Sequence, residues 1–199
     1  MKSYKKEIQV FRIKRGILRT KEAIKSGISP RELYGMRDKG IIQELSRGLY
    51  KLSSDAPVSN PDFVIAGMKI PQGVICLLSA LSYHNITAHI PNKIDIALKK
   101  GATKPRLQYP PINYYWFSER SFKAGVETYT IDKKEIKIYS PEKTVADCFK
   151  FRNRVGLDAA VEALRLCRSR KRCEISTLMK YAEICRVANI IQPYLEAIS

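Results

Sequence analysis

The chain has 199 residues, enough for one large domain or two small ones, and its 45% hydrophobic content excludes a wholly disordered protein. Its 36 lysines and arginines outnumber its 19 aspartates and glutamates, so the formal net charge of +17 favours a polyanion or an acidic protein as partner. No apolar run approaches the roughly 18 residues that cross a bilayer, and the charged N-terminal segment lacks a signal-peptide core, so we expect a cytoplasmic protein without a membrane partner.

The first expected elements are two helices. Residues 4–15 carry a basic amphipathic pattern that favours a helix. Thr20 is placed to cap a second, shorter helix, which Gly27 ends. Ile28 follows as a buried plug between this helix and the next.

The third helix has a complete set of start and stop signals. Ser29 stands at the N-cap, Pro30 at the first helical position, and Glu32 at the position that closes a capping box. Gly40 ends this helix, and residues 41–52 then form two short β-like runs around a tight turn. Short helix, turn, second helix and hairpin together predict a winged helix-turn-helix.

A second helix with basic and polar residues near its start fits the major groove of DNA. Arg31, Tyr34 and Arg37 are the candidates for contacts to base edges. Ser29 can bring backbone N–H groups to a phosphate as well as cap the helix, and Arg47 at the hairpin tip is the candidate for a minor-groove contact by the wing. The further DNA-binding candidates are cations of the same module: Lys21, Lys25 and Lys51, expected at phosphates only, and Lys39.

The charge of this module agrees with DNA binding. Residues 1–55 hold 14 lysines and arginines against 6 acidic residues, a net charge of +8, and phosphates attract such a domain whatever their sequence. Two other interpretations compete: a small helical module that docks on protein, and, for each single cation, an ordinary solvated helix face.

A polar, turn-rich stretch at residues 53–57 marks the boundary between two expected domains, 1–55 and 56–199. The second domain mixes helices and strands and ends in helices. Its expected strands are 94–98, 113–117, 126–131 and 136–139, and its expected helices are 60–68, 77–83, 118–123, 140–151, 157–168, 174–186 and 189–197. The fold class is therefore α+β: an N-terminal winged helix-turn-helix followed by a mixed α/β domain.

The cysteines and histidines give no sign of a metal centre or a disulfide framework. The five cysteines are an odd number without a C-x-x-C pair, so we expect reduced, mostly packed thiols. His84 and His89 have no evident ligand or nucleophile beside them, and Trp116 belongs to an aromatic strand. We expect no metal and no cofactor.

Three segments of the chain form recognisable motifs. They are RGLYKL at 47–52, LSALSYHNIT followed by IPNKIDIAL within 78–98, and YSPEKTVADCFKFRNRVGLDAAVEALR at 139–165. Together they resemble the AbiEi antitoxins of the abortive-infection type IV toxin–antitoxin systems, and the resemblance covers nearly the whole chain.

The resemblance implies a transcriptional regulator that represses its own operon through the N-terminal domain. Its partner would be double-stranded DNA of its own promoter, with inverted repeats as the expected operator. It also implies that the C-terminal domain contributes to antagonism of a nucleotidyltransferase-like toxin in a phage-defence system, without the need for a stable complex.

The densest basic cluster lies in the second domain. It comprises Arg165, Arg168, Arg170, Lys171 and Arg172, and Lys150, Arg152 and Arg154 extend it if they lie nearby in space. We interpret this second basic surface as a further DNA contact or as a surface for toxin antagonism. The alternative is a solvated helix end, where cations suit the helix dipole.

The most distinctive motif contains a polar set at an expected helix start. Its members are Ser140, Glu142, Lys143, Thr144 and Asp147. Such a set serves either as a functional surface or as the capped start of a buried helix, and the pattern favours the structural role.

A nuclease is the competing enzymatic interpretation. Asp95 lies in an expected strand, and Glu135 with Lys137 has the Glu-x-Lys spacing of restriction-type endonucleases, whose carboxylates bind magnesium. That spacing is frequent in a lysine-rich chain, and no Walker motif, glycine-rich nucleotide loop or nucleophile–base pair accompanies it. We therefore expect no enzyme. The third class of function is an interaction protein whose basic surface binds an acidic partner, without specific DNA binding.

Overall fold

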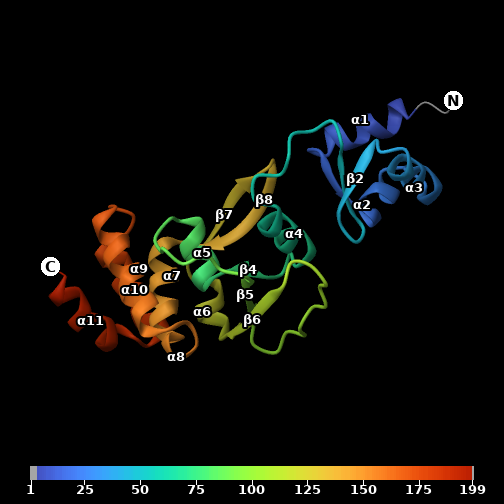
Figure 1. Ribbon diagram of the computed structural model, residues 1–199. Coiled ribbons are helices and arrows are strands. Elements are labelled where there is room, and N and C mark those ends of the chain that lie inside the picture. Colours follow the sequence, from blue (N-terminus) through green and yellow to red (C-terminus); the bar gives the residue numbers. More distant parts are fainter. Residues whose placement is uncertain (1–3, 199) are drawn as a thin grey trace. The chain divides into compact units, whose positions relative to one another are not determined.

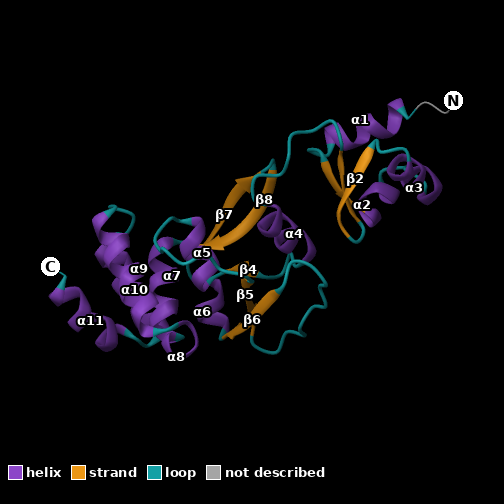
Figure 2. Ribbon diagram, in the orientation of Figure 1, coloured by secondary structure: helices purple, strands orange, loops and turns teal. Residues whose placement is uncertain are grey.

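The computed structural model describes residues 4–198, and within them the chain forms two compact units. The first unit extends to Ile65 and includes Thr130–Glu135, and the second comprises Ala66–Tyr129 and the chain from Ile136 onward. Both units combine helices with strands, which confirms the α+β class (Figure 1; Figure 2).

The first unit contains a winged helix-turn-helix. Its elements are α1 (Lys5–Ile13), β1 (Ile17–Arg19), α2 (Thr20–Lys25), α3 (Pro30–Asp38), β2 (Ile42–Ser46) and β3 (Leu49–Leu52). The strands form an antiparallel sheet of order β1-β3-β2, in which Leu18 of β1 lies opposite Tyr50 of β3. A register shift between Glu44 and Ser46 places a bulge in the wing hairpin.

The start of α2 differs from the expectation. Thr20 is the first helical residue, and Arg19 occupies the N-cap, where its backbone N–H donates to the Glu22 carboxylate at 2.8 Å. The Thr20 hydroxyl donates instead to the Gly48 carbonyl at 3.4 Å. The difference arises from β1, a strand that the sequence does not predict. Its pairing with β3 places the start of α2 beside the wing turn.

The core of the first unit lies between its helices and the small sheet. Phe11 of α1 and Leu33 and Met36 of α3 are fully buried, and Tyr50 and Leu52 cover them from β3. The same core holds Ile28, the residue expected as a plug before α3. The hydrophobic faces therefore fix which side of α3 remains available to a partner.

The second unit is built on a mixed five-stranded sheet. Helix α4 (Pro61–Lys69) contributes residues to both units. After it the elements are β4 (Val74–Ile75), α5 (Leu77–Tyr83), β5 (Ile94–Lys99), β6 (Ile112–Phe117), α6 (Glu119–Lys123), β7 (Val126–Ile131), β8 (Lys134–Tyr139), α7 (Pro141–Lys150), α8 (Arg152–Val155), α9 (Leu157–Ser169), α10 (Ile175–Cys185) and α11 (Ala188–Ala197), with the turn between β7 and β8 counted in the first unit. The strand order is β6-β5-β4-β8-β7; β5 runs parallel to β6 and antiparallel to β4, and β4 runs parallel to β8. The sequence predicts all of these elements except β4 and α8.

Helix α7 is the centre of the second unit. It packs against α5, α9, α10 and α11 (Figure 1), and every residue from Lys143 to Phe149 is buried. Ser140 caps its start by accepting a hydrogen bond from the Lys143 N–H at 3.3 Å, with Pro141 at the first helical position. The cap-plus-proline signal thus marks a buried helix, as the sequence analysis favours.

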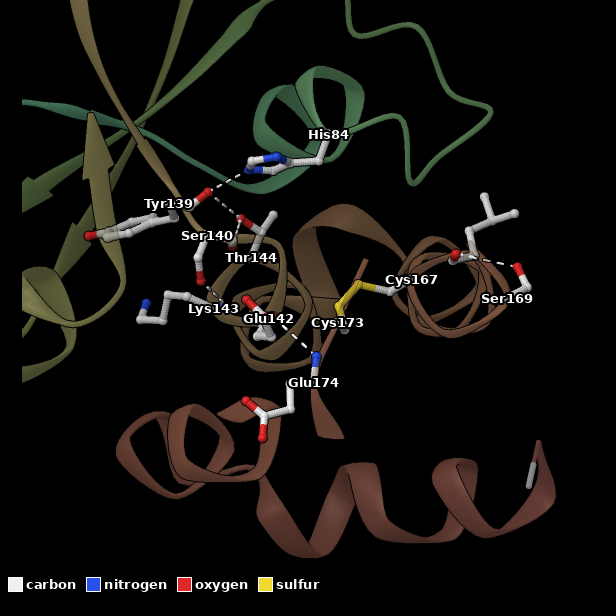
Figure 3. Close-up of a disulfide and its surroundings, with 11 residues drawn as sticks. His84, Tyr139, Ser140, Glu142, Lys143, Thr144, Cys167, Ser169, Cys173 and Glu174 are labelled. Atoms are coloured by element: carbon white, nitrogen blue, oxygen red, sulfur yellow. Dashed lines mark hydrogen bonds between the residues drawn. A yellow bond between two sulfur atoms is a disulfide. The ribbon is translucent and has the colours of Figure 1, made fainter. Parts of the chain in front are cut away.

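Two of the five cysteines form a disulfide, so the expectation of five reduced thiols is wrong. Cys167 near the end of α9 is bonded to Cys173 before α10, with their Cα atoms 5.4 Å apart (Figure 3). Their separation of six residues matches no common motif, and only the reversal of the chain between the two helices brings them together. The other three, Cys76, Cys148 and Cys185, are free and buried.

None of the helices within residues 4–198 combines the length and the apolar composition that a membrane span requires.

Candidate nucleic-acid interface

Helix α3 presents one apolar face and one polar face. Leu33 and Met36 point into the core, while Arg31, Tyr34 and Arg37 are exposed. The helix begins with the expected capping box: the Ser29 hydroxyl accepts from the Glu32 N–H at 3.2 Å, and the Glu32 carboxylate accepts from the Ser29 N–H at 3.1 Å. Gly40, with φ of +67°, follows the last turn in the left-handed conformation that ends helices.

Arg37 is held by two neighbours on the exposed face of α3. Its Nε and Nη2 donate to the Asp38 carboxylate at 3.0 and 2.9 Å, and its guanidinium lies 5.1 Å from the centre of the Tyr34 ring. The hydrogen bond to Asp38 raises the pKa of Arg37 above its ordinary value. One edge of its fork is therefore occupied, so a bidentate contact to guanine through that edge first requires release from Asp38.

Arg31 is less constrained than Arg37. It stands in the first turn of α3, is exposed, and forms no hydrogen bond or ion pair through its side chain within residues 4–198. The positive end of the α3 dipole lies at the same end of the helix and attracts phosphate groups beside the groove. Of the expected base-contacting residues, Arg31 is therefore the one whose guanidinium fork is open.

Lys39 follows α3, and its ammonium lies 5.1 Å from the centre of the Tyr4 ring. Tyr4 and Asp38 are the residues of this surface that the sequence analysis does not single out. Asp38 directly follows Arg37, which is the local signal for their ion pair, whereas the contact between Tyr4 and Lys39 depends on the packing of α1.

The wing is a tight turn between β2 and β3. Arg47 is exposed at this turn, and Gly48 beside it has φ of +69° and donates its N–H to the Glu44 carboxylate at 2.7 Å. The turn thus holds an exposed arginine at the tip of the hairpin, which is the position expected of a minor-groove contact.

The remaining cations of the module differ in exposure. Lys21 and Lys25 are exposed on α2, as a phosphate contact requires. Lys51 is only 5% exposed, and its ammonium donates to the carbonyl groups of Asp55 and Ala56 at 3.0 and 2.9 Å. The expectation of a phosphate contact by Lys51 is therefore corrected: it lies on the central strand of the small sheet and ties down the segment that follows it.

The second basic surface divides in two. Arg165, Arg168, Arg170, Lys171 and Arg172 lie toward the end of α9 and in the loop after it, and all are exposed. Lys150, Arg152 and Arg154 lie before the start of α9, and Arg165 lies about 12 Å along the helix axis from Leu157, the first residue of α9, at about 1.5 Å per residue. Arg154 lies 4.0 Å from the centre of the Tyr115 ring, and Arg152 donates to the Phe149 carbonyl at 3.0 Å. Arg152 and Arg154 thus each contact a group outside the cluster.

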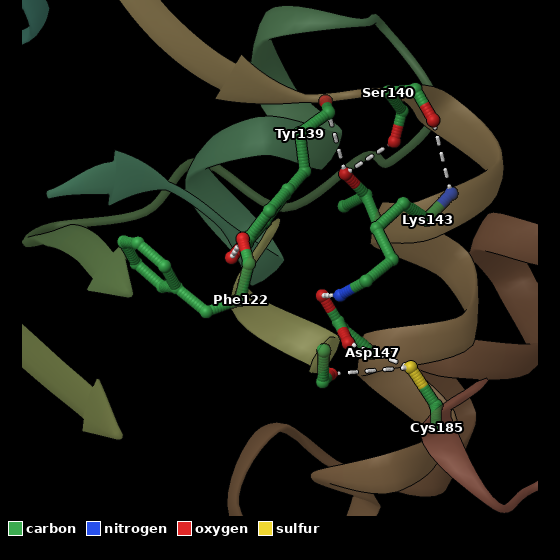
Figure 4. A network of polar contacts seen from close by, with 8 residues as sticks. Phe122, Tyr139, Ser140, Lys143, Asp147 and Cys185 are labelled. Atoms are coloured by element: carbon green, nitrogen blue, oxygen red, sulfur yellow. Dashed lines mark hydrogen bonds and ion pairs between the residues drawn. The ribbon is translucent and has the colours of Figure 1, made fainter. Parts of the chain in front are cut away.

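The polar residues of the 140–147 motif form a closed network (Figure 4). Lys143 and Asp147 pair with each other, and the Cys185 thiol donates to the second oxygen of Asp147 at 3.2 Å. Burial raises the pKa of Asp147, and the neighbouring Lys143 ammonium opposes that rise. Thr144 donates to the Ser140 carbonyl at 2.8 Å. Apart from Glu142, which is partly exposed, the set faces the interior.

The carboxylates of the nuclease interpretation occupy unlike environments. Asp95 is 2% exposed and accepts hydrogen bonds from the Leu78 N–H at 3.1 Å and the Asn113 amide at 3.0 Å, so it caps α5. Burial raises the pKa of this carboxyl group. Glu135 is 67% exposed and lies 3.7 Å from Arg15. No cluster of three or more metal-ligating side chains exists among residues 4–198.

The fold and the exposed face of α3 define the class of the N-terminal part: a winged helix-turn-helix with a basic second helix and a basic wing. Residues 5–52 match the model of a protein family described as "Transcriptional regulator, AbiEi antitoxin". The match confirms the resemblance to AbiEi antitoxins for this segment and supports a regulator or antitoxin role.

One solved structure shares the fold over most of the chain. The crystal structure of the RV2827C protein from Mycobacterium tuberculosis superposes with a TM-score of 0.61 at 11% sequence identity, over 96% of this chain and 79% of that one. No curated protein matches the sequence.

Proposed function

We propose that this protein is a DNA-binding repressor of its own promoter and the antitoxin of a type IV toxin–antitoxin system. In this proposal it opposes a nucleotidyltransferase-like toxin, acts in the cytoplasm as part of an abortive-infection defence against phage, and has no catalytic activity of its own. Antagonism of the toxin does not require a stable complex between the two proteins.

The observation that carries the DNA-binding half is the exposed face of α3. Its start is fixed by the Ser29 capping box, its inner face is locked into the core by Leu33 and Met36, and Arg31 stands in its first turn without an internal partner. A rigid helix with an open arginine at its N-terminal end is the arrangement that reads base edges in the major groove.

The other cations of the module fit contacts to the sugar–phosphate backbone. Lys21 and Lys25 on α2 are exposed, and Arg47 projects from the wing. Such contacts set affinity and register but carry little sequence information. Two copies of the protein on an inverted repeat would double this set of contacts, which is the expected mode of operator recognition.

The family match supports the antitoxin half. It covers residues 5–52, the winged helix-turn-helix, and its printed description names an AbiEi antitoxin. We assign the toxin-opposing role to the second unit, because the exposed cations at the end of α9 offer a surface separate in sequence from the DNA-binding module.

A mobility shift on DNA from upstream of its own gene tests the first half. The wild type is compared with Arg31→Ala/Arg37→Ala and with Lys93→Ala/Arg106→Ala, a control that removes the same charge from exposed positions of the second unit. We expect a promoter-selective shift at about physiological salt, lost in the α3 variant and kept in the control. Equal, weak binding to promoter and scrambled DNA would favour the interaction protein without specific DNA binding.

Growth of cells that carry the toxin gene tests the second half. The full-length Arg31→Ala/Arg37→Ala variant should still rescue growth if antitoxicity resides in the second unit, although it no longer represses the promoter. Loss of both activities together would contradict this division. Magnesium-dependent cleavage of DNA that Glu135→Ala abolishes would overturn the absence of catalysis.

A further inference from the structure

The second unit contains a polar pocket beside the exposed cations after α9, and the proposed function assigns no small-molecule ligand to it. Its volume is about 420 Å³, and it lies between the end of α5, strand β7, the start of α7 and the loop from α9 to α10. Tyr83 and His84 line it from α5 and its C-cap, Tyr129 from β7, and Lys171 and Arg172 from the loop. The volume falls within the range of small-molecule sites, about 300–1,000 Å³.

The loop that carries the two cations is fixed at both ends. The Cys167–Cys173 disulfide closes it (Figure 3). Inside the closed loop the Arg172 N–H donates to the Cys167 carbonyl at 2.8 Å. Arg170 donates to the Asn85 carbonyl at the end of α5, which ties the loop to the opposite wall. Such pre-organisation lowers the conformational cost of binding a ligand.

The cations of the pocket form no ion pair with the described part of the chain. Within residues 4–198 neither Lys171 nor Arg172 forms an ion pair or a side-chain hydrogen bond, and both are exposed. Glu127 and Glu142 act electrostatically on His84 in this pocket, but their printed contacts are to neutral donors: Glu127 accepts from the Tyr129 hydroxyl, and Glu142 accepts from the Glu174 N–H at 3.2 Å. An ammonium and a guanidinium side by side on a fixed loop are typical of a phosphate-binding rim.

The opposite wall is aromatic. The rings of Tyr83 and Tyr129 meet edge to face with centroids 5.0 Å apart, and His84 lies 5.3 Å from Tyr83 and 5.6 Å from Tyr129. The His84 Nε2 lies 2.7 Å from the Tyr139 carbonyl, an acceptor only, so this nitrogen carries the hydrogen. Burial lowers the pKa of His84, which keeps the ring neutral near pH 7.

We propose that this pocket binds a nucleoside 5′-phosphate. Lys171 and Arg172 hold the phosphate groups, and the Tyr83–Tyr129 wall contacts the base. A phosphate anion alone would use only the cationic rim, whereas a nucleotide uses the rim and the aromatic wall together, which is the combination that the pocket offers.

Isothermal titration calorimetry of the full-length protein with ATP, CTP and pyrophosphate tests the proposal at about 0.15 M salt. Lys171→Ala/Arg172→Ala should weaken the binding of all three ligands at least tenfold. The charge-matched control Lys93→Ala/Arg106→Ala should change affinity less than twofold. Tyr83→Leu should weaken the nucleotides severalfold and leave pyrophosphate unchanged.

Three results would overturn the proposal. The first is that neither nucleotide binds the wild type at millimolar concentration. The second is that Lys171→Ala/Arg172→Ala and the control lose the same amount of affinity. The third is that pyrophosphate binds as tightly as the nucleotides and Tyr83→Leu does not weaken nucleotide binding. The third result would identify a site for the phosphate anion alone. Circular dichroism melting of each variant confirms that a loss of binding is not a loss of folding.

Discussion

Lys143 and Asp147 form an ion pair one turn apart on α7, with both side chains 0% exposed (Figure 4). The Lys143 ammonium lies 4.3 Å from the centre of the Tyr139 ring and 5.0 Å from that of Phe117. A buried ion pair offsets the loss of hydration only when hydrogen bonds satisfy both partners, and here Cys185 supplies a further donor to Asp147. The pair therefore stabilises α7 only as long as it is complete.

Breaking this pair should cost far more than breaking a pair on the surface. Lys143→Met leaves a buried carboxylate without its counter-ion, so we expect the free energy of unfolding to fall by about 3–5 kcal/mol. The double variant Lys143→Met/Asp147→Leu removes both charges and should recover at least half of that loss. Urea denaturation of the three proteins measures both effects.

The matched control is the exposed pair Glu119–Lys123, which has the same spacing on α6 and side chains that are 55% and 72% exposed. Lys123→Met should cost no more than about 1 kcal/mol. Equal losses at Lys143 and Lys123 would contradict the assignment of a desolvated pair to α7.

The Ser29 cap should contribute measurably to the stability of the first unit. Ser29→Ala removes the acceptor for the Glu32 N–H, and we expect the free energy of unfolding to fall by about 1 kcal/mol. Ser29→Asn, which restores a capping oxygen, should recover most of the loss. Ser53→Ala is the control, because Ser53 is exposed in the same unit. Thermal denaturation that does not distinguish Ala from Asn at position 29 would argue against a structural role for the cap.

Local signals predict the elements that local chemistry determines. Ser29 with Glu32, and Ser140 with Pro141, mark the starts of α3 and α7 to the residue, because capping involves only neighbours along the chain. Strands β1 and β4 escape prediction because they are short and gain their stability from distant partners. Ile75 of β4, for example, pairs with Ile96 and Ile138.

The candidate site shows the same division. Exposure of Arg31 and Arg47 follows from the helix period and the hairpin turn, and both lie on the surface as expected. Lys51 lies on β3, which is central in its sheet, and the chain at Asp55 and Ala56 covers the lysine. The covering segment is only four and five residues further along the chain, but the turn that folds it back over the lysine leaves no periodic signal in the sequence.

The disulfide between Cys167 and Cys173 should stabilise the second unit. Closing a loop of six-residue separation removes entropy from the unfolded chain worth about 2 kcal/mol in the chain-entropy account. Cys173→Ser should lower the free energy of unfolding by about this amount, and dithiothreitol should produce the same loss in the wild type. The variant should itself be insensitive to dithiothreitol. A wild type whose unfolding curve is unchanged by the reductant would show that the bond does not contribute.

His84 should make stability depend on pH. Burial is the main cause that lowers its pKa below the ordinary value of 6.5, and Arg172 acts in the same direction. Hydrogen bonding to Tyr139 and the charges of Glu127 and Glu142 oppose the shift.

The unfolded chain therefore takes up a proton at His84 near pH 6.5, while the folded protein does so only at lower pH. The contribution of His84 to the free energy of unfolding is fully present above pH 6.5 and is lost as the pH falls toward the pKa of His84 in the folded protein. The free energy of unfolding then falls by at most about 1.4 kcal/mol per pH unit. Urea denaturation between about pH 7.5 and about pH 5 should show this decline in the wild type and a shallower one in His84→Gln. A slope that persists unchanged in His84→Gln would place the titrating group outside the pocket.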